Sequence, residues 1–169
     1  LDELLQAELP GQVVDGDLNN ALMAETLVAG AQADFECGYQ GHLLGVEAGF
    51  GNAFHYTAFQ IEMIRIANRQ ARTIEHGIGE CGITRDPIWF IMHRGRTQSA
   101  DAARRILEEM DAADVTDLDF LVGKAHAYEA YATQILSEDW CDMVFDGSGT
   151  KVSRLDGMAR AEARFDLAI

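Results

Sequence analysis

Lysine is scarce in this chain of 169 residues, and neither lysine nor arginine occurs before Arg65. The whole chain has 13 basic residues against 28 acidic ones, which gives a formal net charge of −15. Nucleic-acid binding needs clustered lysine and arginine side chains that contact the phosphates. The charge balance therefore argues against nucleic acid as a partner.

Cysteine is also rare, and the chain has only Cys37, Cys81 and Cys141. Three widely separated cysteines match neither a zinc-site spacing nor a disulfide framework, so we expect reduced thiols and a cytoplasmic protein. A run of 18 uncharged apolar residues is absent, because Glu25, Asp34 and other polar residues interrupt the most apolar stretch. The sequence therefore predicts no membrane span.

Helical periodicity dominates what the sequence does contain. Hydrophobic residues make up 48% of the chain, which is enough for one helical domain over residues 1–169. Apolar side chains that recur every three or four residues predict a series of amphipathic helices. We expect these helices at about 19–48, 53–78, 87–93, 99–113, 117–138 and 156–168.

The fold class that we expect is all-α, an up-down helical bundle of the ferritin-like four-helix type. Thr97 or Ser99 is a candidate N-cap for the helix at 99–113. Thr116, with Asp119 three residues later, resembles a capping box for the helix at 117–138. Residues 140–154 depart from the helical pattern around Asp146-Gly147, which predicts a β-hairpin or an irregular excursion.

Acidic side chains interrupt the apolar faces of three predicted helices. A buried carboxylate needs a proton, a basic partner or a metal. Carboxylates and imidazoles that project inward from several helices build di-iron and di-manganese sites, which normally carry Glu-x-x-His on two helices. This chain has only the inverted spacing HAYE. The candidate ligands of an iron or manganese pair are Glu25, Glu36, Glu62, His126 and Glu129.

A structural role for the same acids stays open. Glu62 has arginines three and seven residues further along its own predicted helix, at positions suited to an ion pair. Glu25 and Glu36 face solvent if the core face of their helix is the opposite one. Glu129 could instead bond a tyrosine or an arginine across the bundle.

Three histidines form a second pattern. They end the segments NAFH (His55), TIEH (His76) and FIMH (His93). These contexts resemble the three-histidine metal pocket in the helical ligand-binding domain of GntR-type bacterial regulators. The resemblance implies that His55, His76 and His93 are alternative metal ligands in a helical regulatory domain.

Three functions remain open from the sequence. The first, which we favour, is a metal-dependent oxidoreductase or metal-handling protein with an inward-facing carboxylate and histidine site. The second is a helical ligand-binding or regulatory domain, and the third is a non-catalytic subunit of a larger complex. Residues 18–64 carry little charge, as interface cores do, so we expect a homo-oligomer or a subunit of a complex.

Overall fold

The computed structural model describes residues 13–42 and 88–169 of the chain. Helix accounts for 74% of these described residues, which confirms the predicted all-α class. Two short 3₁₀ helices, η1 (Asp15–Asn19) and η2 (Ala21–Met23), precede the first long helix. The long helices are α1 (Ala24–His42), α4 (Ile88–Glu108), α5 (Leu118–Asp139) and α6 (Arg154–Asp166).

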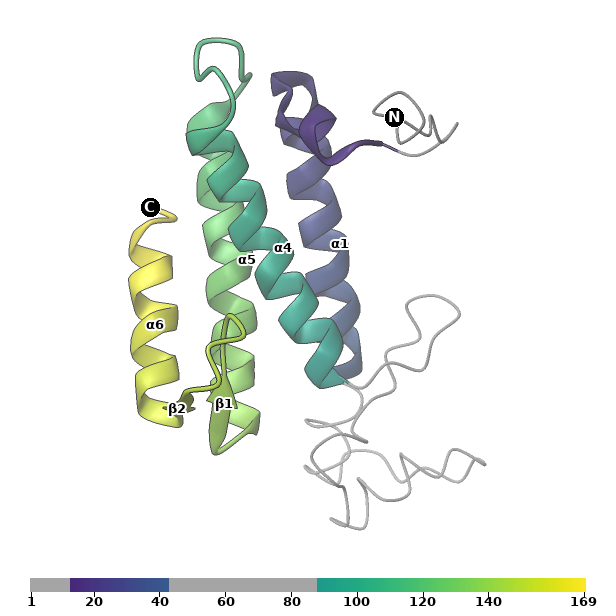
Figure 1. The fold of residues 1–169 in the computed structure, drawn as a ribbon. Helices are drawn as coiled ribbons and strands as arrows, with labels where there is room; N and C mark the ends of the chain where they lie inside the picture. Colours follow the sequence, from purple (N-terminus) through teal and green to yellow (C-terminus); the bar gives the residue numbers. More distant parts are fainter. Residues whose placement is uncertain (1–12, 43–87) are drawn as a thin grey trace.

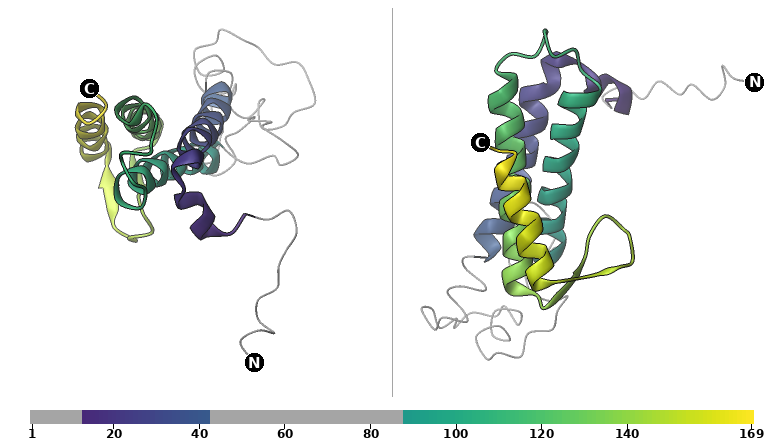
Figure 2. Two further views of the ribbon diagram at one scale, coloured as in Figure 1. Left: turned by 90° about the horizontal axis from the view of Figure 1, so that it is seen from above. Right: turned by 90° about the vertical axis from the view of Figure 1, so that its left-hand side faces the viewer.

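The long helices pack side by side and run in alternating directions (Figures 1 and 2). Helices α1, α4 and α5 contact one another, and α6 packs along α5. The predicted helical bundle is therefore confirmed for the described residues. The predicted helix at 53–78 lies outside them, and the ferritin-like type stays a prediction.

A short β-hairpin connects α5 to α6, as the sequence predicts for residues 140–154. Strand β1 (Asp142–Val144) pairs antiparallel with β2 (Lys151–Ser153). Asp146 and Gly147 both have positive φ, at 59° and 63°, and the Ser148 N–H donates to the Phe145 carbonyl at 3.2 Å. This is the geometry of a tight hairpin turn, for which Asp-Gly is a favoured pair.

Helix α4 corrects the prediction of two separate helices at 87–93 and 99–113. One continuous helix spans this region and ends at Glu108. The hydroxyls of Thr97 and Ser99 do not cap a new helix. They donate to the carbonyls of His93 and Gly95 at 2.5 and 2.7 Å, one turn earlier in the same helix. Such bonds allow a serine or threonine to sit inside a helix.

The predicted capping box before α5 is also wrong. Asp117, and not Thr116, is the N-cap of α5, and its side chain makes no capping hydrogen bond. The φ of Asp117 is 54°, in the left-handed region that aspartate tolerates better than most residues. A side-chain cap occurs instead at α6, where the Ser153 hydroxyl accepts from the Asp156 N–H at 3.2 Å.

Close helix contact depends on small residues in the core. At Gly95 on α4, an added Cβ would lie 2.9 Å from the backbone N and Cα of Phe35 on α1. Only a residue without a side chain fits at this distance, so Gly95 lets the two helices approach closely. Phe35 and Met92 belong to one of two buried hydrophobic clusters, which also includes residues of α5, the hairpin and the residue between them: Ala132, Ile135, Leu136, Trp140, Met143, Phe145 and Val152.

The cysteines differ from the expectation of three reduced thiols. Cys37 is disulfide-bonded, whereas Cys141 is a free and exposed thiol. The expected cytoplasmic location stays a prediction. Within residues 13–42 and 88–169, no helix is long and apolar enough to cross a membrane, in agreement with the sequence.

Candidate functional site

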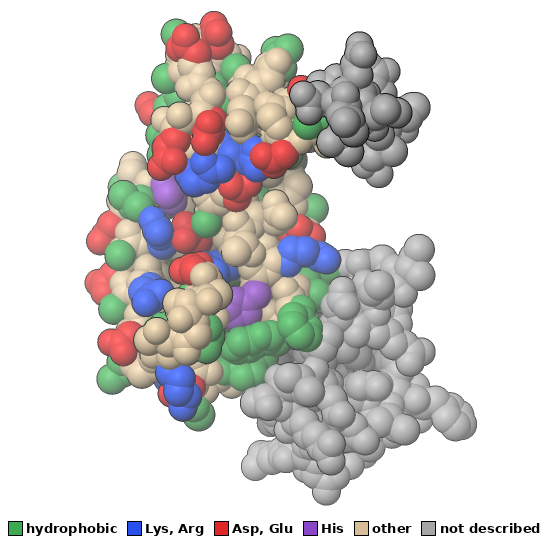
Figure 3. Space-filling view, viewed as in Figure 1, with side chains coloured by type: hydrophobic (Ala, Val, Ile, Leu, Met, Phe, Trp, Pro, Cys, Tyr) green, Lys and Arg blue, Asp and Glu red, His purple; other side chains and the backbone are tan. Residues whose placement is uncertain are grey.

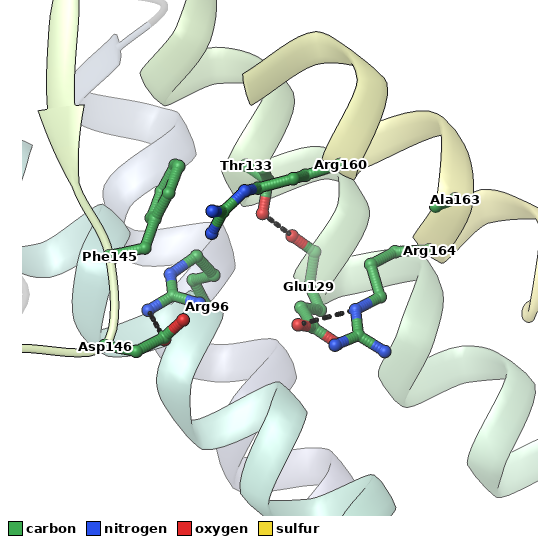
Figure 4. Close-up of a pocket in the computed structure, with 8 residues that line it drawn as sticks. All are labelled: Arg96, Glu129, Thr133, Phe145, Asp146, Arg160, Ala163 and Arg164. Atoms are coloured by element: carbon green, nitrogen blue, oxygen red, sulfur yellow. Dashed lines mark hydrogen bonds and ion pairs between the residues drawn. The ribbon is translucent and has the colours of Figure 1, made fainter. Parts of the chain in front are cut away.

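A cavity of about 300 Å³ opens between α4, α5, α6 and the β-hairpin. Its volume is at the lower end of the range for small-molecule sites. Figure 4 shows that its charged side chains come from all of these elements and project toward one another. The lining residues are Arg96, Glu129, Thr133, Phe145, Asp146, Arg160, Ala163 and Arg164.

Arg96 is the buried cation of this cavity. Only 7% of its side chain is exposed, although it carries a positive charge. Its Nη2 donates to Asp146 Oδ1 at 2.7 Å, and its guanidinium carbon lies 4.9 Å from the centroid of the Phe145 ring. Its Nε is buried and has no hydrogen-bond partner among the described residues. Arg96 therefore has a buried N–H donor for which the described residues provide no acceptor.

Arg160 brings a second positive charge to the same aromatic ring. Its guanidinium carbon lies 5.4 Å from the Phe145 centroid, and Figure 4 shows it extending from α6 toward Arg96. Within the described part of the chain, no carboxylate forms an ion pair with Arg160. A guanidinium over an aromatic ring gains a cation–π attraction, but two such groups beside one ring also repel each other.

Glu129 and Arg164 form the second ion pair among the residues that line the cavity. Glu129 Oε1 lies 3.1 Å from Arg164 Nε, and 5% of the Glu129 side chain is exposed against 44% for Arg164. The other carboxylate oxygen, Oε2, lies 3.6 Å from His126 Nδ1. Both of these atoms are buried and without a hydrogen bond among the described residues. The buried carboxylate is thus compensated mainly by an arginine across the bundle.

His93 on α4 lies beside Phe145, one of the residues that line the cavity. Its ring lies 4.4 Å from Trp89 and 5.7 Å from Phe145, measured between ring centroids. Burial, followed by the positive charge of Arg96, lowers the pKa of His93 from 6.5 to about 4, and Asp146 opposes this effect. His93 is therefore neutral at neutral pH and adds no charge to the cavity.

The four predicted metal ligands that the structure describes do not come together. Glu25 and Glu36 are exposed, and Glu62 lies outside the described residues. Glu36 Oε1 accepts from Gln32 Nε2 at 2.5 Å along its own helix. Only His126 and Glu129 are neighbours, as reported above. Among the described residues, no three histidine, cysteine or acidic side chains group in a way that could hold a metal ion.

The reason for this difference is the orientation of α1. Its buried residues include Ala24, Val28, Ala31 and Phe35, so the core face is offset from the face that carries Glu25 and Glu36. The alternative interpretation of these two acids, exposure to solvent, agrees with the structure. The alternative for Glu129 also agrees, because an arginine pairs with it across the bundle.

The alternative histidine pocket is described only at His93. His55 and His76 lie outside the described residues. Nε2 of His93 is buried and has no hydrogen-bond partner within the described part. Its nearest aromatic neighbours are Trp89 and Phe145, as given above. The three-histidine set therefore stays a prediction.

Sequence reasoning missed the arginines that line the cavity. The available signal was Arg160 and Arg164, which are four residues apart and therefore share one face of the last helix. Arg96 gave no such signal, because its partner Asp146 is 50 residues away in the chain.

Figure 3 shows the molecule from the same side as Figure 1. On this side of the described residues, basic side chains lie interspersed with acidic ones.

Comparisons with known proteins give no further guide to this cavity. No protein-family model, curated protein or solved structure matches the chain.

Proposed function

We propose that this chain is a helical ligand-binding domain whose cavity takes a small anionic ligand. The observation that carries the proposal is the placement of Arg96 and Arg160 beside one ring, that of Phe145. Asp146 is the one carboxylate that the described structure pairs with either guanidinium. A bound anion between the two arginines would offset their mutual repulsion.

The burial of Arg96 supports the same function. A guanidinium with 7% of its side chain exposed is costly to keep in a protein interior unless it has several partners. Its Nε has none among the described residues. Arginine is well suited to bind carboxylate or phosphate groups through two parallel hydrogen bonds. An anionic ligand in the cavity would supply further acceptors to this guanidinium.

The favoured expectation from the sequence, an iron or manganese pair in a ferritin-like bundle, depends on Glu62. That residue and the predicted helix at 53–78 lie outside the described structure. The described residues support the metal site less well than the anion site, because Glu129 already pairs with Arg164. The ligand-binding function is therefore the one that we put forward.

Isothermal titration calorimetry with small anions tests this function. The probes are sulfate, methanesulfonate, succinate and butyrate, at constant ionic strength because salt screens charge interactions. At least one of them should bind the wild-type protein. R160Q should weaken that binding about tenfold or more, since a hydrogen bond to a charged group is lost.

R154Q is the matched control, because it removes one positive charge from the same helix. The guanidinium of Arg154 donates to the Glu138 carbonyl, and Arg154 does not line the cavity. Binding to R154Q should equal binding to the wild type within about twofold. The proposal is wrong if none of the four anions binds, or if R160Q and R154Q bind the anion equally well.

A further inference from the structure

One carboxylate that lines the cavity, that of Asp146, is free to turn outward into solvent. Asp146 lies in the hairpin turn, and 62% of its side chain is exposed. Gly147 and Gly149, which follow it closely, both have positive φ, and an added Cβ on either would meet nothing within 4 Å. The turn is thus open to solvent around the one acidic side chain that it contributes to the cavity.

Glu129, the other carboxylate of the cavity, is held much more firmly. It lies on α5, its side chain is 5% exposed, and Arg164 on the packed helix α6 pairs with it. Displacing Glu129 would leave a buried negative charge without a partner, which is strongly unfavourable. Of the two carboxylates, Asp146 is therefore the exchangeable one.

The buried guanidinium of Arg96 needs a negatively charged partner in the absence of a ligand. The Arg96 side chain is 7% exposed, and a buried charge without a partner destabilises the fold. Asp146 neutralises it when the cavity holds no ligand. A ligand that binds Arg96 must compete with this carboxylate for the same guanidinium.

The charges then define the class of ligand. With Glu129 paired to Arg164, removal of Asp146 leaves Arg96 and Arg160 as two positive charges without a counterion in the cavity. A ligand with two negative charges would neutralise both. We propose that the cavity binds a small dianion, which displaces Asp146 from Arg96 and bridges Arg96 and Arg160. This inference rests on the proposed anion-binding function.

Two kinds of compound carry this chemistry, a tetrahedral oxyanion and a short dicarboxylate. Two matched pairs of probes separate charge from shape. Sulfate and methanesulfonate are both tetrahedral at sulfur, and succinate and butyrate both have four carbons, but only the first of each pair has two negative charges. In at least one pair, the dianion should bind about tenfold or more tightly than the monoanion, because it bonds to a second guanidinium. The pair with the larger difference identifies the kind of ligand.

Variants of Asp146 test the displacement. D146N removes the competing carboxylate and should tighten dianion binding by about fivefold, the range expected for loss of a partly exposed ion pair. D146G should act in the same direction, and it suits the left-handed φ of 59°, so that it preserves the turn if the asparagine variant unfolds. Thermal unfolding followed by circular dichroism checks that each variant is folded.

D142N is the matched control on the same hairpin. Asp142 is exposed and pairs with Lys151, outside the cavity, so its loss gives the same change in net charge. It should alter dianion affinity by less than about twofold. The displacement is refuted if both Asp146 variants bind the dianion as tightly as D142N does, or more weakly than the wild type.

The outcomes distinguish this inference from the function on which it rests. If monoanions bind as tightly as dianions and R160Q weakens both, the cavity is an anion site but the dianion inference is wrong. If no probe binds the wild type, the proposed function itself is wrong, and the inference fails with it.

Discussion

Replacing His93 with phenylalanine should make the fold less sensitive to acid. Burial and the nearby Arg96 charge lower the pKa of His93 from 6.5 to about 4 in the folded protein. In the unfolded chain the same imidazole has its ordinary pKa, near 6.5. The folded state therefore accepts a proton less readily than the unfolded state does.

The free energy of unfolding follows from these two pKa values. Above pH 6.5 His93 is neutral in both states, and its contribution to stability is fully present. As the pH falls from 6.5 to about 4, the unfolded state is protonated first, so stability is lost over this window. Each unit of pKa difference corresponds to about 1.4 kcal/mol, which sets an upper limit of about 3.5 kcal/mol. Since the ring is only half-buried, solvent screening reduces the expected loss to about 2 kcal/mol.

Urea unfolding of the wild type and H93F, at neutral pH and near pH 4.5, measures this contribution. Carboxylates also titrate between these values, so the difference between the two proteins is the relevant quantity. Between neutral pH and pH 4.5, the free energy of unfolding of H93F should fall by about 2 kcal/mol less than that of the wild type. The phenylalanine ring can keep the contacts with Trp89 and Phe145. R96Q should show an intermediate loss, because Arg96 is the second cause of the lowered pKa. If the wild type and H93F lose stability in parallel, the stated cause of the acid sensitivity is wrong.

Three further predictions concern packing, metal and association. G95A should destabilise the fold by about 1–3 kcal/mol, because its Cβ would press on the backbone of Phe35, whereas G30A, with nothing within 4 Å, should stabilise it by up to about 1 kcal/mol. Equal stabilities of the two variants in urea would contradict this account of the helix contact. If an iron or manganese pair forms with Glu62, elemental analysis after reconstitution should find stoichiometric metal in the wild type and less in E129Q. Absence of metal from the reconstituted wild type would end that expectation. Light scattering should find an oligomer or a co-purifying partner, since residues 18–64 carry little charge, as interface cores do. A clean monomer over a wide concentration range, without a partner, would refute this.

The sequence by itself determined most of the local structure. The period of apolar residues predicted α5 to within about one residue at each end, because this signal depends only on neighbours along the helix. Asp146-Gly147 predicted the hairpin turn for a similar reason, since the required positive φ is a property of the two residues themselves. The prediction of a new helix N-terminus at Thr97 or Ser99 was wrong, because these hydroxyls bond to carbonyls within α4 instead of capping a helix.

The cavity, in contrast, was decided by the tertiary structure. The sequence identified Glu129 as an acid within an apolar stripe, but it could not choose between a metal and an arginine as its partner. Arg164 became that partner because α6 packs along α5. The hairpin likewise brought Asp146 to Arg96 across 50 residues of chain. A charge on one helix has no preferred partner until packing fixes which face it presents, and only then does a set of separate arginines become a site.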